Sequence, residues 1–150
     1  MNSQPQGCNK MISYYDFKKK LSFLLNRANL ATDGIAIVPG PINNEGLFYE
    51  IKGNNFIFAY SECGNIDIIC ETENENEFYY HIVKHCVKYH AINYEVKHRK
   101  PNLDTRRLWM TKALQWMELI DILYYKKLKE DFEQTVLKYP FKDVLTNEDA

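Results

Sequence analysis

A proline at position 101 separates two stretches with helical periodicity, and this corner limits the possible folds more than any other feature of the chain. Proline disfavours the α conformation of the residue before it, so the helix predicted over roughly residues 75–98 has to end at or before Lys100. Asn102 or Asp104 can then cap a second helix by accepting hydrogen bonds from its first backbone N–H groups. The corner therefore predicts two helices joined by a sharp change of direction.

The stretch after the corner, residues 103–139, contains neither glycine nor proline. A single helix of that length is uncommon in a compact domain, so we expect a break near Asp121 and one helix on either side of it. The apolar side chains predicted to face the core in the first of these helices are Trp109, Met110, Ala113, Leu114, Trp116, Met117 and Ile120. Those predicted for the second are Tyr125, Leu128, Phe132, Val136 and Tyr139.

Before these helices the periodicity changes from helix to strand. A first helix is predicted to begin after Ser13, an N-cap residue, and to bury Phe17, Leu21, Leu24 and Ala28. Runs with β-type spacing follow at residues 35–38, 47–51, 56–61 and 66–71, divided by turn residues. We predict an α+β fold with an N-terminal helix, a three- to four-stranded antiparallel meander and three C-terminal helices packed against the sheet.

Length and composition favour one domain, since a chain of 150 residues can bury roughly 70% of the surface that its unfolded form exposes. We interpret residues 1–10 as a disordered leader, residues 11–143 as a single α+β domain and residues 144–150 as a loose tail. No apolar run approaches the ~18 residues of a membrane span, and no export signal is evident. We therefore expect a cytoplasmic protein, with no membrane partner and with its four cysteines reduced.

The formal net charge is only −1, but it is unevenly distributed. Residues 34–77 hold one basic and eight acidic residues, a net charge of −7. Such a segment attracts a basic partner, and nucleases tend to be basic because they bind phosphates. The alternative is an exposed face that only keeps the protein soluble. The acidic residues predicted to contact a partner are Glu50, Glu62, Asp67, Glu71, Glu73, Glu75 and Glu77.

Charges of both signs crowd the corner beside wide apolar faces. We predict that Arg106 or Arg107 forms a forked ion pair with Glu95 or Asp104, which would lock the corner. If that pair is buried, Glu95→Ala should destabilise the protein by about 3 kcal/mol, because the remaining charge loses its partner. The corner is thus interpreted as a polar clamp.

The sequence offers little for catalysis or cofactor binding. His81 and His85 have the spacing of two zinc ligands on one helical face, but a closed zinc site needs about four ligands, so we predict no metal site. No Ser or Cys nucleophile lies at a recognisable motif spacing and no glycine-rich phosphate loop is present, so we predict no catalytic residue and no cofactor. The basic run Lys97–Lys100 beside Tyr94 leaves a small nucleic-acid-binding or regulatory protein as the alternative function.

Several residues around the corner occur in an order that resembles a known family. They are Tyr94, Glu95, Lys97, His98, Arg99, Asp104, Arg106, Arg107, Lys112, Gln115, Glu118 and Leu119, followed by Tyr139–Asp143. The pattern is similar to that of the immunity protein 63 family of bacterial polymorphic toxin systems, and residues 78–143 carry it best. The resemblance implies an immunity protein that binds and neutralises a cognate toxin domain, with no catalysis of its own.

Members of this family bind different toxins, so the resemblance leaves open the identity of the toxin, the surface that binds it and the oligomeric state. A basic toxin such as a nuclease would suit the acidic segment. The resemblance also implies that the shared corner residues are scaffold before they are contact surface. These residues are Tyr94, Glu95, His98, Arg99, Asp104, Arg106 and Arg107.

Overall fold

The computed structural model describes residues 12–144, which divide into two compact units. Unit 1 comprises residues 12–23 and 32–83, and unit 2 comprises residues 24–31 and 84–144. The leader expected at residues 1–10 lies outside the described range, as do residues 145–150 of the expected tail. The expectation of a single domain stays a prediction.

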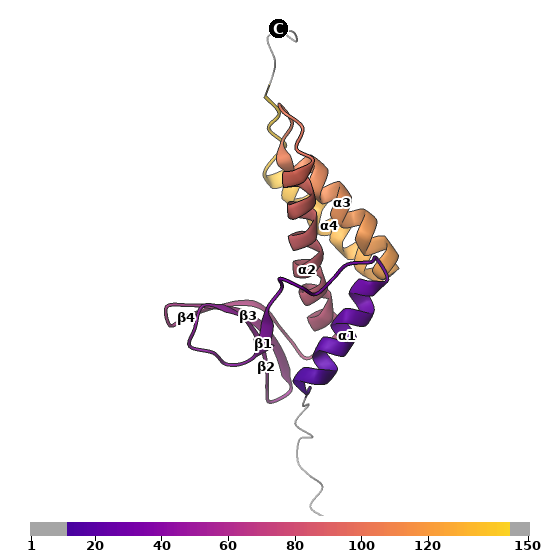
Figure 1. Ribbon diagram of the computed structural model, residues 1–150. Coiled ribbons are helices and arrows are strands. Elements are labelled where there is room, and N and C mark those ends of the chain that lie inside the picture. The colour runs from indigo at the N-terminus through magenta and orange to yellow at the C-terminus, as the bar shows by residue number, and fades with distance from the viewer. Residues whose placement is uncertain (1–11, 145–150) are drawn as a thin grey trace, which may run out of the picture. The chain divides into compact units, whose positions relative to one another are not determined.

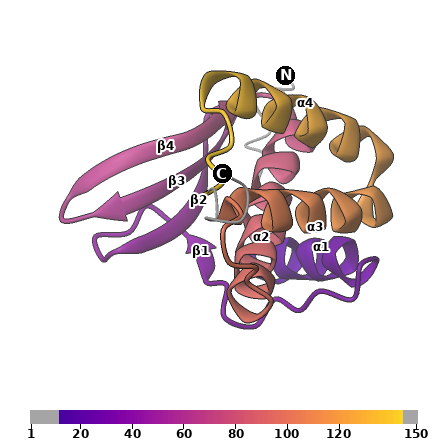
Figure 2. The same cartoon turned by 90° about the horizontal axis from the view of Figure 1, so that it is seen from above.

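Unit 1 is built around a four-stranded sheet (Figure 1). The spatial order of its strands follows the sequence. Its strands are β1 (Ile37–Pro39), β2 (Gly46–Lys52), β3 (Asn55–Glu62) and β4 (Asn65–Thr72). The meander of β2, β3 and β4 is antiparallel, as predicted, and is visible from above in Figure 2.

The pairing of β1 corrects the expectation of a purely antiparallel sheet, because β1 runs parallel to β2. Parallel neighbours usually need a long crossover connection. Here β1 is only three residues long, so residues 40–45 suffice to return the chain to the start of β2 in the same direction.

One face of the sheet packs on aromatic rings from two helices. The helix α1 (Tyr14–Asn26) begins where predicted, since Ser13 Oγ accepts a hydrogen bond from the Asp16 N–H at 3.0 Å. The Phe17 ring of α1 stacks on Tyr49 of β2, with 4.2 Å between centroids. Phe78, near the start of α2 (Glu75–Lys97), lies 5.3 Å from the Phe56 ring of β3 and is fully buried. These rings form the core of unit 1.

The opposite face carries a smaller apolar cluster. Strand alternation places Leu47, Tyr49 and Ile51 opposite Tyr60, Phe58 and Phe56, and leaves Phe48 opposite Ala59 on the other side, as predicted. The buried residues of this second cluster are Phe48, Ile57 and Ala59, against which Val38 and Ile42 pack. The sheet is therefore covered on both faces over β2 and β3.

Unit 2 contains the second half of α2, the helix α3 (Thr105–Ile120) and the helix α4 (Ile122–Lys138). The break between α3 and α4 falls at Asp121, as predicted. The Asp121 backbone is extended and its N–H donates to the Met117 carbonyl, while its carboxylate accepts from the N–H groups of Leu123 and Tyr124. One aspartate therefore ends α3 and caps α4.

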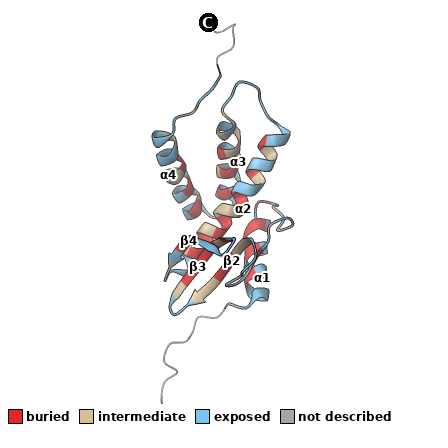
Figure 3. Ribbon diagram, turned by 90° about the vertical axis from the view of Figure 1, so that its left-hand side faces the viewer, coloured by how far each residue is buried: buried red, intermediate tan, exposed pale blue. Residues whose placement is uncertain are grey.

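Buried and exposed residues alternate along α3 and α4, as one-sided helices require (Figure 3). The stripe predicted for α4 omits a buried residue at its start and extends one residue too far at its end. Tyr124 is buried and Tyr125 only half-buried, because the buried residues Leu128 and Phe132 continue backwards in steps of four. Tyr139 is exposed and follows the helix. With an N-terminal helix, a four-stranded sheet and three further helices, the α+β class is confirmed.

Candidate functional site

The acidic residues predicted to contact a partner fall into two groups. The first lies on the sheet of unit 1 and consists of Glu50 in β2, Glu62 at the end of β3, and Asp67 and Glu71 in β4. Glu50 is half-buried and the other three are exposed. Glu50 and Glu71 both lie opposite Ile57, so they share one face of the sheet. This group is accessible to a partner.

The second group, at the start of α2, consists of Glu73, Glu75 and Glu77. Glu75 lies 3.6 Å from the ammonium of Lys20. Glu77 accepts a hydrogen bond from the Thr72 hydroxyl at 3.0 Å, and its N–H donates to Asn74 Oδ1 at 3.0 Å. Glu75 and Glu77 therefore help to begin α2 at its positive end, which makes them weaker candidates for partner contact.

An acidic residue that sequence reasoning did not single out adds to the first group. Glu45, in the loop before β2, accepts a hydrogen bond from the Tyr60 hydroxyl at 2.7 Å. This hydrogen bond is the largest of the causes that raise the pKa of Tyr60 to about 12, and the charges of Glu45 and Glu62 act in the same direction. The carboxylates of Glu45 and Glu62 thus both act on the Tyr60 hydroxyl.

The edge strand β4 also exposes apolar side chains that sequence reasoning treated only as strand residues. Ile66, Ile68 and Ile69 are 51%, 56% and 43% exposed. The run Ile66–Ile69 is mostly apolar, which is typical of a strand buried on both faces, so its exposure has no signal in the local sequence. The isoleucines are exposed because β4 is an edge strand of the sheet.

In unit 2 the corner joins the start of α3 to the segment after α4. Asp104 caps α3 by accepting the Arg106 N–H at 2.9 Å, and it also binds the Arg106 guanidinium through Nε and Nη2 at 3.1 and 2.8 Å. Arg106 donates further to the carbonyls of Tyr139 and Pro140, at 2.7 and 2.9 Å. The hydrogen bonds from Arg106 and from the Lys142 N–H hold the pKa of Asp104 well below its ordinary value.

A second ion pair fastens the same segment. Arg107 Nη2 lies 2.9 Å from Asp143 Oδ2, and Asp143 Oδ1 accepts the Asp104 N–H at 2.9 Å. The hydrogen bond from Arg107, followed by that from the Asp104 N–H, lowers the pKa of Asp143. The guanidinium carbons of Arg106 and Arg107 lie 5.2 and 4.3 Å from the centre of the Phe141 ring. The contacts of these residues are internal to unit 2.

Glu95 pairs with a different arginine from the two that we predicted. Its carboxylate is bound by Arg99, with Nε to Oε1 at 2.8 Å and Nη2 to Oε2 at 3.2 Å. The Glu95 residue is 2% exposed, whereas the Arg99 side chain is 58% exposed. Of the forked pairs considered from the sequence, the one between Arg106 and Asp104 is present.

The basic run Lys97–Lys100 is exposed, but its surroundings give little support to nucleic-acid binding. The Tyr94 ring stacks on His98, with 4.0 Å between centroids, and lies 4.7 Å from the Lys112 ammonium. Arg99 is held by Glu95. The ring that would stack on a base and one of the cations are thus already engaged within unit 2.

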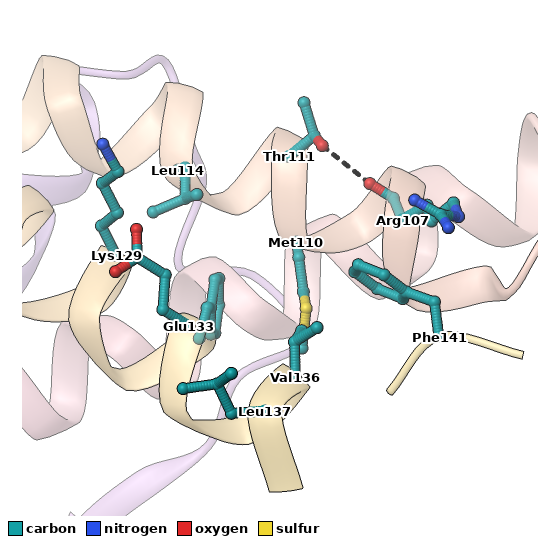
Figure 4. A pocket seen from close by; sticks show the side chains of 10 residues that line it. Arg107, Met110, Thr111, Leu114, Lys129, Glu133, Val136, Leu137 and Phe141 are labelled. Atoms are coloured by element: carbon teal, nitrogen blue, oxygen red, sulfur yellow. Dashed lines mark hydrogen bonds between the residues drawn. The ribbon is translucent and has the colours of Figure 1, made fainter. Parts of the chain in front are cut away.

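An open groove between α3 and α4 was not anticipated from the sequence (Figure 4). Its volume is about 550 Å³. Its walls are largely apolar, with Phe141 next to Arg107 at one end and Lys129 and Glu133 on α4. The apolar lining residues are Met110, Leu114, Phe132, Val136, Leu137 and Phe141. Four of these belong to the predicted stripes, which were interpreted as continuous core.

No group of three or more His, Cys, Asp or Glu residues within residues 12–144 is placed to hold a metal ion. Of the two histidines at zinc-like spacing, His85 has its pKa lowered by burial and then by the charge of Lys88. Over the same range, none of the helices combines the length and the apolar character that crossing a membrane requires.

Comparison with known protein families gives a match. Residues 53–134 match the family model described as Immunity protein 63, and this range covers β3, β4, α2, α3 and most of α4. The corner residues from Tyr94 to Arg107 fall inside it, whereas the Tyr139–Asp143 segment does not. Searches of curated proteins and of solved structures found no match.

Proposed function

The chain belongs to the immunity protein 63 family, and on that basis we propose that it binds and neutralises a cognate bacterial toxin domain. The match over residues 53–134 is the observation that carries this proposal. We propose a stoichiometric inhibitor that acts in the cytoplasm and has no catalysis of its own. Neutralisation then depends only on the free energy of association with the toxin.

The charge distribution supports a basic toxin, such as a nuclease. The exposed carboxylates of Glu62, Asp67 and Glu71 lie on one sheet, in a segment whose net charge is −7. Such a surface speeds encounter with a basic protein and favours it over other partners. An inhibitor that covers the phosphate-binding surface of a nuclease would also block access of its substrate.

Co-expression with a candidate toxin domain, sought among the genes that neighbour this one, tests the proposal. We expect growth to be rescued and the two proteins to co-purify as a 1:1 complex. An unrelated immunity protein, expressed at the same level, is the control and should not rescue growth. If both proteins are folded and neither rescue nor a complex is observed, the proposal is wrong.

Titration of the purified toxin separates inhibition by binding from an enzymatic mechanism. We expect toxin activity to fall in proportion to added protein and to reach its minimum at one equivalent. Loss of toxin activity at a small fraction of one equivalent would mean turnover, which a stoichiometric inhibitor does not show.

A further inference from the structure

The last strand of the sheet, β4, has an open outer edge. Among the described residues only β3 pairs with it. Alternate residues of an edge strand direct their N–H and C=O groups away from the neighbouring strand, where another strand can pair with them. The eight residues of β4 include no proline and no lysine, which commonly protect such edges. Neither of these two residue types therefore hinders the addition of a strand at this edge.

The exposed isoleucines of β4 continue an apolar surface. Ile66 lies opposite Ser61 and Ile68 lies opposite Ala59, so both are on the face that carries the buried cluster of Phe48, Ile57 and Ala59. Both isoleucines are more than half exposed. An added strand with apolar side chains on that face would remove them from water and extend the cluster by one strand.

The register of β4 gives this edge a particular shape. Phe58 lies opposite Cys70 and Ala59 opposite Ile68, so Ile69 is an extra residue in β4. An extra residue of this kind bends a strand and increases its local twist. A partner has to match that bend, so the edge discriminates between strands.

The charges around β4 indicate what kind of partner fits. Residues 53–77 contain no lysine and no arginine, while Asp67 and Glu71 within β4 and Glu62 just before it are exposed. Two copies of β4 placed side by side would bring carboxylates together, which opposes self-association. A strand that carries lysine or arginine would gain from the same charges.

We propose that β4 is the docking edge for the toxin, and that a basic extended segment of the toxin domain adds to the sheet beside it. Backbone hydrogen bonds supply part of the affinity, Ile66 and Ile68 supply apolar contact, and Asp67 and Glu71 pair with cationic side chains. This inference rests on the proposed function and names the surface and the partner chemistry for it.

Hydrogen–deuterium exchange of the purified 1:1 complex with the toxin domain found by co-expression tests whether the backbone of β4 pairs with an added strand. We expect the outward-facing amides among residues 65–72 to exchange at least about tenfold more slowly in the complex than in the free protein, since new interstrand hydrogen bonds protect them. Protection that is confined to other elements, such as α3 and α4, would overturn the proposal.

Side-chain variants test the same edge in binding assays. We expect Ile68→Lys and Asp67→Lys each to raise the Kd for the toxin by about tenfold or more. The matched controls are Ile92→Lys on α2 and Glu118→Lys on α3, both exposed and both in unit 2, and we expect no change in Kd from them. Unchanged binding by both β4 variants would overturn the proposal. If Ile68→Lys does not fold, the exposed Asp67 still provides the test.

The outcomes separate this inference from the function on which it rests. If the wild-type protein binds and rescues but the β4 variants bind equally well, the toxin docks elsewhere and only the docking edge is wrong. If the wild-type protein neither binds the toxin nor rescues growth, both the proposed function and the proposed docking edge are wrong. A dimer of this chain that Asp67→Lys strengthens would show that a second copy, and not a toxin, occupies the edge.

Discussion

The ion pair between Glu95 and Arg99 is buried at one end and exposed at the other. Glu95 is 2% exposed, and the Arg99 side chain is 58% exposed. The loss of about 3 kcal/mol expected for Glu95→Ala assumed that both partners were buried. Since water can solvate Arg99 once Glu95 is gone, we now expect a smaller loss for that change. The two partners of the pair are therefore not equivalent.

We expect Arg99→Ala to destabilise the protein more than Glu95→Gln. Removal of the arginine leaves a buried carboxylate without its partner, and because Arg99 is largely exposed it removes little packing. In Glu95→Gln the buried group is neutral and keeps its shape. The free energy of unfolding in urea, measured for the wild type and both variants, shows which variant is less stable. An equal or smaller loss for Arg99→Ala would contradict this account of the pair.

At the scale of elements, Asp121 sets the boundary between two helices. Its carboxylate accepts from the N–H groups of Leu123 and Tyr124 at 2.9 and 3.0 Å, and its own N–H donates to Met117. Without this side chain the first N–H groups of α4 lose their acceptor, while the chain from Thr105 to Lys138 still has helical propensity.

We expect Asp121→Ala to lower the free energy of unfolding by about 1 kcal/mol, as is usual for loss of an N-cap. Asp121→Asn is the matched control, because asparagine caps about as well as aspartate and should retain most of the stability. Denaturant unfolding followed by circular dichroism measures both variants. If both variants lose the same free energy of unfolding, the N-cap hydrogen bonds of Asp121 do not stabilise this boundary.

The clamp between the start of α3 and the Tyr139–Asp143 segment should depend on acid pH. The pKa values of Asp104 and Asp143 are lowered from 3.8 by their hydrogen bonds with Arg106 and Arg107. The unfolded chain therefore takes up protons on these carboxyls at a higher pH than the folded protein. Their contribution to stability is complete above about pH 4 and is lost as the pH falls through the folded pKa values.

We expect Asp104→Asn to reduce the difference in unfolding free energy between about pH 6 and about pH 3, because one carboxyl with a lowered pKa is gone. Glu118→Gln, at an exposed position of α3, is the control and should leave that difference as in the wild type. Urea unfolding at a series of pH values gives the comparison. An undiminished pH dependence in Asp104→Asn would show that this carboxylate contributes nothing to it.

For the whole molecule, sequence reasoning succeeded where neighbouring residues decide the structure. The cap at Ser13 and the break at Asp121 depend on side chains that bond to backbone groups two or three residues away. The strands and their alternation follow from turn residues and apolar spacing. The parallel pairing of β1 could not be predicted from these signals. The direction in which β1 pairs depends on its length and on its connection to β2.

The candidate site was less predictable because it depends on contacts between distant residues. Seven carboxylates were equivalent in the sequence, yet Glu75 lies beside Lys20 and Glu77 beside Thr72, whereas Asp67 and Glu71 are exposed on β4. The partner of Glu95 is different, because it is local. Arg99 lies four residues later, at the spacing that makes side chains neighbours on a helix, so this pair could have been predicted from the sequence.

The two compact units are expected to unfold as one. The boundary between them falls inside α1, between Phe23 and Leu24, and inside α2, between Val83 and Lys84. Melting of one unit alone would cut both helices short, α1 by its last three residues or α2 well inside its length, with loss of backbone hydrogen bonds and of packing along their apolar faces. This continuity favours a single cooperative transition, in keeping with the expected single domain.

Probes confined to each unit can test this expectation. Both tryptophans, Trp109 and Trp116, lie in unit 2, whereas all four strands lie in unit 1. We expect the denaturant midpoint from tryptophan fluorescence to coincide with that from amide exchange of the β3 residues. Coincident curves mean that α1 and α2 couple the units. Separate midpoints would contradict the prediction and show that residues 12–144 form two domains, each with its own stability.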